Sequence, residues 1–287
     1  MGKRMDVLLF SEGKKKALTL SYDDGVIQDR RLIDILDEHG LKATFNLNAG
    51  LLGFSGRAVI DGKDTDISKI FPDEVPVLYA AHEVAGHGLW HSSLPNLGAP
   101  AAVQEIIEDR RQLEKLTGKM VQSFAYPFGA QNRTVRDILS LCGYQGARTV
   151  VSTHRFDIPE DFLQWDPTCH HNDPDLMALA EHFCSGDDPF GRAPLFCLWG
   201  HAYEFDAQDN WDVAVHFARY VSGFKDRVWF ATNGEIIRYI QAWRSLQYSA
   251  DASMVRNPSG SAVWIGLMGR AIEIPGGSTV TLPETGS

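Results

Sequence analysis

The 287-residue sequence has little cysteine, no long apolar run and no excess of basic residues. Its four cysteines show no CxxC or paired spacing, so reduced thiols are expected rather than a disulfide framework. No stretch of about 18 apolar residues exists, which excludes a membrane-spanning helix and gives no reason to expect a membrane partner. Lys and Arg number 27 against 37 Asp and Glu, a net charge of −10, so a basic face for nucleic acid is not expected.

An export signal is also missing from this chain. The apolar run Val7 to Phe10 is too short for a signal-peptide core, and a cytoplasmic location is therefore the expectation. Near the other end, Leu282 to Gly286 spell LPETG, the recognition sequence of sortases. No apolar segment follows it here, and we interpret the match as a tag or a coincidence.

Strand-like and helix-like patterns alternate along most of the chain. Residues 17–22 alternate as in a strand, 28–39 place their apolar residues on one helical face, and 42–48 are strand-like again. Such a βαβ unit implies parallel strands, and its repetition predicts an α/β barrel or a doubly wound sheet. No GxGxxG or GxxxxGK[ST] motif follows a strand, which disfavours nucleotide binding. The same rhythm continues through helix-like residues 101–116, 132–142, 175–184, 211–224 and 234–243 and strand-like residues 123–126, 146–152, 195–199 and 227–231.

The composition divides the chain into residues 1–244, which carry the α/β rhythm, and residues 245–287. The latter lose helical periodicity and gain turn signals, which predicts a small C-terminal β appendage of three or four strands. If the protein forms oligomers, this β segment is the expected surface. Residues 53–72, rich in Gly and Asp, are expected to be an insertion or surface loop.

Two adjacent carboxylates, Asp23 and Asp24, follow the first predicted strand and precede Gly25. Like charges at neighbouring positions raise each other's proton affinity unless a cation intervenes. A bend at the strand end would let one carboxylate ligate a metal while the other faces a substrate. A solvated turn is the simpler explanation of these residues taken alone.

Histidines at two further places carry candidate chemistry. His87 and His91 are four residues apart, which on a helical turn would place both imidazoles on one face, at a spacing suited to a metal. With Asp24 they would give two imidazoles and one carboxylate and leave coordination positions open. His201 ends the apolar run that begins at Leu195, at the strand edge where barrel active sites lie, and could act as a general acid.

These segments together resemble the polysaccharide deacetylase family, carbohydrate esterase family 4, in order and spacing over about residues 16–240. The [ST]-[FY]-DDG motif appears at 21–25, H-[ST]-x-x-H at 87–91, R-x-P-[FY]-G at 125–129, and the strand-end histidine at 201. The resemblance implies a distorted (β/α)7 barrel and a hydrolase that deacetylates N- or O-acetylated sugars of an oligo- or polysaccharide. It further implies Asp23 as catalytic base, His201 as catalytic acid, and one divalent metal, Zn in the first place with Co or Ni as alternatives, on Asp24, His87 and His91.

The cleft residues follow from the same resemblance and from their positions. We expect substrate contacts from Tyr126, Phe128, Trp199, His170 and His171, with the backbone N–H of Phe128 facing the oxyanion. The last two belong to a polar segment, 169–173, that has no match in the family pattern.

Three departures from the family pattern bear on how the site is tuned. Gly88 stands where Ser or Thr is usual, and Ala125 stands where an Arg usually fixes the base, so another group is expected to orient Asp23. The Asp-Trp motif that supports the histidine is not recognisable, and Trp165-Asp166 is the nearest candidate.

Other functions remain open at this point. Related barrels hydrolyse cyclic amides, some without metal, and the chain could also be a non-catalytic carbohydrate-binding protein. A two-His-one-carboxylate iron oxygenase would share the ligand types, although the jelly-roll usual for such enzymes does not fit the βα rhythm.

Overall fold

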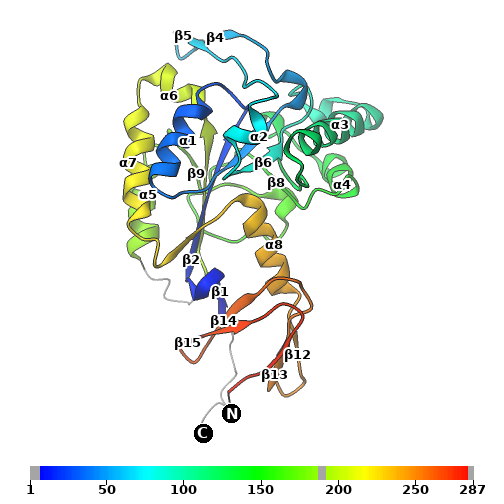
Figure 1. Ribbon diagram of the computed structural model, residues 1–287, viewed down its shortest axis with the longest axis vertical. Helices are drawn as coiled ribbons and strands as arrows, with labels where there is room; N and C mark the ends of the chain where they lie inside the picture. Colours follow the sequence, from blue (N-terminus) through cyan, green and yellow to red (C-terminus); the bar gives the residue numbers. More distant parts are fainter. Residues whose placement is uncertain (1–6, 187–191, 284–287) are drawn as a thin grey trace.

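The computed structural model describes residues 7–186 and 192–283. Its centre is a curled parallel sheet in which seven strands follow the order β8-β7-β6-β3-β2-β10-β9, and β11 pairs with the first half of β2 (Figure 1). This arrangement confirms the expected distorted (β/α)7 barrel. The strands are β2 (Lys16–Asp23), β3 (Thr44–Leu47), β6 (Glu83–Gly86), β7 (Ser123–Ala125), β8 (Gly146–Arg148), β9 (Cys169–His170), β10 (Leu195–His201) and β11 (Val228–Phe230).

Helices cover the outside of the sheet, as in other α/β proteins (Figure 1). In α1, Leu32, Ile33 and Leu36 are buried on one face, and Gly40 follows the helix with a φ of 64°, the left-handed conformation that suits glycine. The helices are α1 (Asp29–Glu38), α2 (Val75–Leu78), α3 (Ala99–Thr117), α4 (Arg133–Leu141), α5 (Leu176–Ser185), α6 (Ala202–Gln208), α7 (Trp211–Ser222) and α8 (Asn233–Arg244). Short 3₁₀ turns are η1 (Ser11–Gly13), η2 (Ala49–Leu51), η3 (Leu94–Asn96), η4 (Pro127–Gly129) and η5 (Phe162–Gln164).

The segment expected to be a surface loop has structure of its own. It contains the hairpin of β4 (Arg57–Ile60) and β5 (Lys63–Asp66), which projects beyond α6 at the upper end in Figure 1. After the hairpin, Lys69 forms an isolated antiparallel bridge with Val26. The insertion therefore returns to the residues that directly follow the Asp23-Asp24-Gly25 bend.

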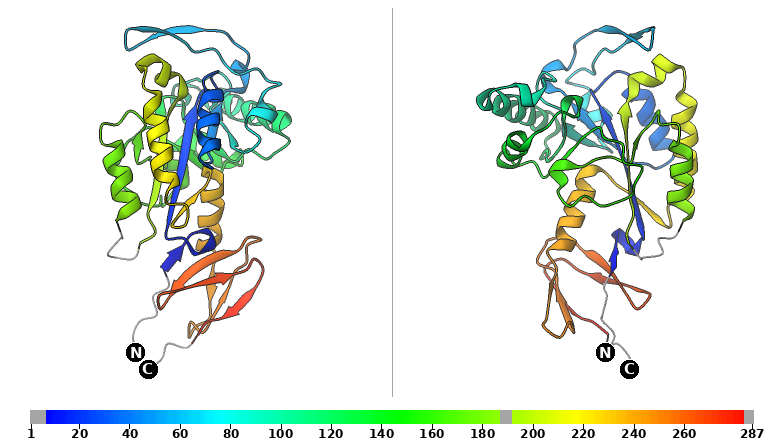
Figure 2. Two further views of the ribbon diagram at one scale, coloured as in Figure 1. Left: turned by 60° about the vertical axis from the view of Figure 1, so that its left-hand side comes forward. Right: turned by 180° about the vertical axis from the view of Figure 1, so that it is seen from behind.

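The C-terminal β strands lie at the opposite end of the molecule from the β4–β5 hairpin (Figure 2). They form two small sheets, and the N-terminal strand β1 (Val7–Leu9) joins one of them by antiparallel pairing with β14. Ile265 and Val255 of these sheets share an apolar cluster with Ile236 of α8. The strands are β12 (Gln247–Tyr248), β13 (Met254–Arg256), β14 (Val263–Leu267), β15 (Arg270–Ile274) and β16 (Thr279–Thr281).

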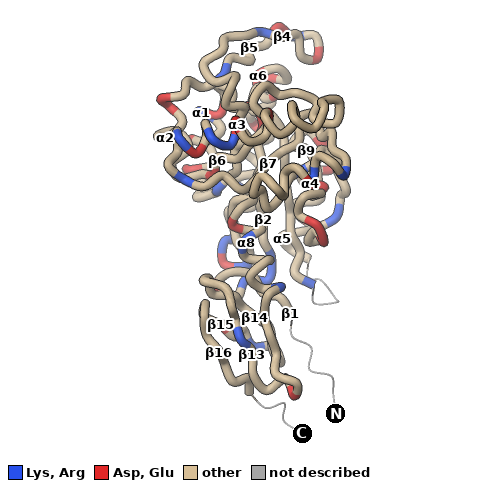
Figure 3. Tube along the Cα trace, turned by 90° about the vertical axis from the view of Figure 1, so that its right-hand side faces the viewer, with Lys and Arg blue, Asp and Glu red and all other residues tan. Residues whose placement is uncertain are grey.

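Among residues 7–186 and 192–283, no helix is long and apolar enough to cross a bilayer. In the view of Figure 3, basic and acidic positions are interspersed over the barrel. The LPETG segment lies outside the described residues from position 284 onward.

Candidate active site

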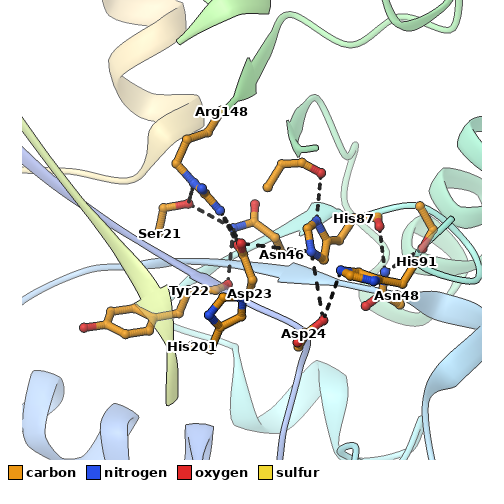
Figure 4. Close-up of polar contacts among 12 residues, drawn as sticks. Ser21, Tyr22, Asp23, Asp24, Asn46, Asn48, His87, His91, Arg148 and His201 are labelled. Carbon is orange, nitrogen blue, oxygen red and sulfur yellow. Dashed lines mark hydrogen bonds and ion pairs between the residues drawn. The ribbon is translucent and has the colours of Figure 1, made fainter. Parts of the chain in front are cut away.

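The predicted site residues meet at the carboxyl-terminal edge of the sheet, where barrel active sites form. Asp23 ends β2, and His201, its register partner, ends the neighbouring strand β10. His87 directly follows β6, and Phe128 lies in the turn after β7. The segments at the ends of β2, β6 and β10, distant in sequence, thus contribute side chains to one place (Figure 4).

A backbone bend separates the two adjacent carboxylates. Asp24 has a φ of 83° and Gly25 a φ of 61°, so the chain leaves the strand in a left-handed turn. Asp24 is thereby directed toward the histidines, with its Oδ1 atom 3.9 Å from Nε2 of His87 and 3.7 Å from Nε2 of His91. A continuous strand would have pointed Asp23 and Asp24 to opposite faces of the sheet.

The two histidines converge without the helical turn that the sequence predicted. Gly88 has a φ of 76° and His91 a φ of 57°, values that break any helix between the two imidazoles. The left-handed backbone at position 88 also accounts for glycine in place of Ser or Thr, because a side chain there would be strained. The i,i+4 spacing indicated two histidines that do converge, but the helical turn that it predicted is absent.

The ligand atoms of Asp24, His87 and His91 all lie within 4.8 Å of one another, as a metal site requires. Nδ1 of His87 lies 2.8 Å from the backbone oxygen of Ala125, so we assign the proton to Nδ1 and a free lone pair to Nε2. Burial lowers the pKa of both histidines, that of His91 to about 4, which keeps both imidazoles neutral. This donor set, two neutral imidazoles and one carboxylate, fits a divalent cation such as zinc.

A buried carboxylate and a buried amide hold the loop that carries His87. Oδ2 of Asp109, on α3, accepts the backbone N–H groups of His87 and Gly88, each at 3.1 Å, and Oδ1 accepts that of Ala49 at 2.8 Å. Asn48 donates to the carbonyl oxygens of His87 and Gly88 at 2.6 and 2.8 Å. These contacts take over the steadying role that a Ser or Thr hydroxyl plays in the family pattern.

Asp23 is oriented by Arg148, which the sequence analysis did not single out. The Arg148 guanidinium, at the end of β8, donates to both carboxylate oxygens of Asp23, and Asn46 adds a hydrogen bond of 2.8 Å. Burial, the largest single influence, raises the pKa of Asp23, but Arg148 together with His87 and His201 outweighs it, and the net pKa lies below the usual value. Asp23 is therefore an ionised proton acceptor, and Arg148 does what the missing Arg at position 125 would do.

Lys69 brings a second cation to the site from the insertion. Its Nζ lies 3.5 Å from Oδ1 of Asp24, and the side chain is largely buried. Burial raises the pKa of Asp24, but Lys69, the strongest of the neighbouring basic groups, and the surrounding histidines together lower it to about 2. Asp24 is consequently ionised and able to ligate a metal over the whole physiological pH range.

The candidate acid, His201, has a carboxylate partner that the sequence analysis also missed. Its Nδ1 lies 3.3 Å from Oε1 of Glu204, three residues later on α6. Burial lowers the pKa of His201, but the contacts with Glu204 and the charge of Asp23 more than compensate and raise it above the ordinary value. The predicted supporting pair does not serve here, because Trp165 is a core residue and Asp166 accepts a hydrogen bond from Thr149.

Comparison with known proteins agrees with this geometry. Residues 11–147 match the model of the polysaccharide deacetylase family. No protein among the curated sequences matches the chain.

The fold of these deacetylases extends over most of the chain. A Mycobacterium smegmatis protein classed as a polysaccharide deacetylase is 16% identical, with a TM-score of 0.62 over 83% of this chain and 94% of its own. The Xyl-CE4 domain of a multidomain xylanase from the hindgut metagenome of Trinervitermes trinervoides is 17% identical, with a TM-score of 0.51 over 80% and 92%. The chitin deacetylase of the fungal pathogen Colletotrichum lindemuthianum is 18% identical, with a TM-score of 0.51 over 80% and 89%.

Within this deacetylase fold, two of the expected substrate contacts are core residues. Tyr126 is fully buried and donates its hydroxyl to the backbone oxygen of Leu163 at 2.8 Å. His171 is buried between the rings of Tyr22 and Phe205. Both lie in segments that were expected at the cleft, but their side chains point inward, so neither offers a surface to a sugar.

The remaining three expected contacts line the site. Phe128 is 66% exposed, and the centroid of its ring lies 4.5 Å from that of His91. Trp199 lies beneath the Arg148 guanidinium, which is 4.7 Å from its ring centroid, and its indole N–H has no partner among the described residues. His170 contacts both Trp199 and Glu204. These residues could position a substrate, with Phe128 as the one freely accessible aromatic surface among them.

Proposed function

We propose that the protein is a metal-dependent deacetylase that hydrolyses the acetyl amide, or an acetyl ester, of a sugar unit. The observation that carries this proposal is the meeting of three functions in one place: a ligand set of two neutral imidazoles and one aspartate, an ionised carboxylate beside it, and a histidine with a raised pKa opposite. Each corresponds to one requirement of amide hydrolysis: carbonyl polarisation, water activation and protonation of the amine.

Asp24, His87 and His91 would hold the cation, with zinc as the first candidate and cobalt or nickel as alternatives. When bound, a divalent cation polarises the acetyl carbonyl and makes a coordinated water more acidic. The chain's own contribution is to keep these three ligands deprotonated and fixed through Lys69 and Asp109.

Asp23 accepts the proton of the attacking water. Its link to Arg148 and Asn46 holds the carboxylate in one orientation, so that a lone pair stays directed into the site. The backbone N–H of Phe128, next to His91, is the candidate donor to the oxyanion of the tetrahedral intermediate.

His201 donates its proton to the leaving nitrogen. An amine anion is far too basic to depart unprotonated, so C–N cleavage depends on this donation. An ester with a weakly basic alcohol would depend on it much less. The same site would therefore cleave N-acetyl and O-acetyl groups with different demands on His201.

The decisive experiment is acetate release from N-acetylated oligosaccharides and acetyl esters, before and after chelation and with Zn²⁺, Co²⁺ or Ni²⁺ restored. We expect chelation to stop release and metal to restore it, with one metal ion bound per chain. His87→Ala should bind no metal and release no acetate, whereas His216→Ala, which alters an exposed histidine on α7, should behave as the unaltered protein.

The outcomes separate the alternatives that the sequence left open. Release that is unaffected by chelation and by His87→Ala would overturn the metal-dependent mechanism. Stoichiometric metal with no acetate from any sugar would instead direct the search to cyclic amides. Sugar binding without metal or turnover would indicate a carbohydrate-binding protein.

A further inference from the structure

Glu204, a residue that no family motif covers, lies at the centre of a cluster of histidines. Its Oε1 lies 3.3 Å from Nδ1 of His201, and its Oε2 lies 3.0 Å from Nε2 of His170 and 3.1 Å from Nε2 of His171. The carboxylate is mostly buried, with 17% of the side chain exposed. One carboxylate thus faces three imidazoles at the wall of the site.

This cluster could hold a second metal on distance alone, because the ligand atoms of His170, His171 and Glu204 lie within 4.8 Å of one another. The proton positions argue against it. The backbone N–H of Asn172 donates to Nδ1 of His170 at 3.1 Å, so a neutral His170 carries its proton on Nε2, the atom that faces Glu204. A protonated Nε2 donates a hydrogen bond to the carboxylate and has no lone pair for a metal.

The position of Glu204 is fixed from several directions. Oε2 accepts the backbone N–H of His201 at 3.2 Å, the arrangement of a capping box at the start of α6. On the other side, Gly200 lies so close to His171 that an added Cβ would come within 2.0 Å of Nδ1 of that ring. The glycine before His201 therefore makes room for the imidazole that packs against Glu204.

We propose that Glu204 is the positioning residue of the general acid: its carboxylate forms an ion pair with Nδ1 of His201, 3.3 Å away, and thereby directs Nε2 of that ring toward the leaving group. His170 donates to the second oxygen and keeps the carboxylate from rotating. This inference rests on the proposed deacetylation for the acid role of His201, whereas the ion pair itself does not depend on it.

The proton balance of the step follows from this arrangement. As the C–N bond breaks, its electron pair goes to nitrogen and the Nε2 proton of His201 is transferred to the same nitrogen. His201 becomes neutral and keeps the proton on Nδ1, the atom that faces Glu204, so the ring does not turn between turnovers. The negative charge of Glu204 stabilises the imidazolium that must form before the next cycle.

A matched control exists within the chain. Glu235 occupies the same third position of α8 and accepts the backbone N–H of Thr232 at 2.9 Å, and its side chain pairs with Lys42 at the surface rather than with a histidine of the site. Glutamine is tolerated at this capping position, so Glu204→Gln and Glu235→Gln should both fold. Only the former removes a charge from His201.

The kinetic test compares two leaving groups. For an N-acetylated chito-oligosaccharide, Glu204→Gln should lower kcat about 100-fold, the size of effect expected when general-acid catalysis is weakened. For 4-nitrophenyl acetate, whose leaving group departs without protonation, the change should be less than about threefold. Glu235→Gln should leave both rates unchanged. Equal loss on both substrates would mean a merely structural role and would overturn the proposal.

A double-mutant cycle adds a second criterion. In a His201→Ala background, Glu204→Gln should lower amide hydrolysis no further, because Glu204 acts through His201. Full additivity of the two effects would contradict a shared role.

Nitrogen-15 NMR tests the pairing of Nδ1 of His201 with Glu204 without any substrate. The holoprotein should show an Nδ1–H resonance, assigned by its loss in His201→Ala, that also disappears in Glu204→Gln and persists in Glu235→Gln. Absence of this resonance in the unaltered protein would overturn the inference. Its presence in a protein that cleaves no acetyl amide would refute the proposed function and leave the Glu204–His201 contact intact.

Discussion

Two groups of histidines face each other across the site, and their environments drive protonation in opposite directions. His87 and His91 are buried against one another, and desolvation lowers their pKa. His201 is also buried, yet its contact with Glu204 and the charge of Asp23 raise its pKa. Burial therefore does not decide the charge of an imidazole by itself; the balance with nearby carboxylates does.

This difference assigns separate tasks to residues of the same type. Neutral imidazoles with free lone pairs suit a cation, whereas a protonated imidazole suits a leaving amine. Asp23 lies between the two sides and is kept ionised by Arg148. The fold separates the two functions by placing one carboxylate with each group of histidines.

The largest expected effect comes from the residue between the two sides. Asp23→Asn should bind metal in a 1:1 ratio but lower acetate release by about 10³-fold on amides and esters alike, because water activation precedes either cleavage. Metal content and kcat on both substrate types are the measurements. Full activity in this variant would exclude Asp23 as the base. It would also contradict the expected contrast with Glu204→Gln, which should slow amide hydrolysis but not ester hydrolysis.

A smaller effect is expected beneath the metal ligands. Asp109→Asn would set an amide NH₂ or a single oxygen against the N–H groups of Ala49, His87 and Gly88 that the carboxylate now accepts. Metal affinity should fall by about 10- to 100-fold, as is usual when partners of metal ligands are altered. Competition with a chromophoric chelator measures the dissociation constant. An unchanged constant would limit Asp109 to a folding role.

Asp137→Asn is the matched control for that substitution. Asp137 lies on the exposed face of α4, with 68% of its side chain accessible. It should leave metal affinity unchanged. Comparable weakening in both variants would show that the assay reports general destabilisation rather than loop geometry.

The smallest effect is on the pH profile of activity, in which the protonation of the metal-ligating histidines should be distinguishable from that of His201. His201 is charged below its raised pKa and loses its proton as the pH increases through that value, so amide hydrolysis should fall about tenfold per pH unit on the alkaline side. The candidate metal ligands limit activity only at acidic pH, because His91 becomes protonated near pH 4. Esters with good leaving groups should lack the alkaline fall. Identical profiles for both substrate types would contradict the division of roles.

How much of this site could be read from the sequence depends on whether a contact is local. The candidate base, acid and metal ligands lie at or after the ends of strands in a recognisable order, and parallel strands bring such residues to one edge of the sheet. These residues are Asp23, Asp24, His87, His91 and His201. The fold class could be predicted for the same reason, since the βα rhythm is periodic along the chain.

The orienting residues escaped prediction because they depend on how the sheet curls. Arg148 comes from β8, at the far end of the strand order from β2, and only the curvature brings its guanidinium to Asp23. Asp109 contacts the loop that carries His87 and Gly88 from the middle of α3. Glu204 alone left a local signal, its position three residues after a strand-end histidine, typical of a capping box.

The pairing of β1 with β14 has a mechanical consequence. The first and last strands of the described chain, β1 and β16, belong to the two small sheets at the end of the molecule away from the site, here called the small β unit. A pulling force applied to the two ends would first load the antiparallel pairs of that unit. The barrel, and with it the spacing of Asp24, His87 and His91, would bear load only after those pairs had opened.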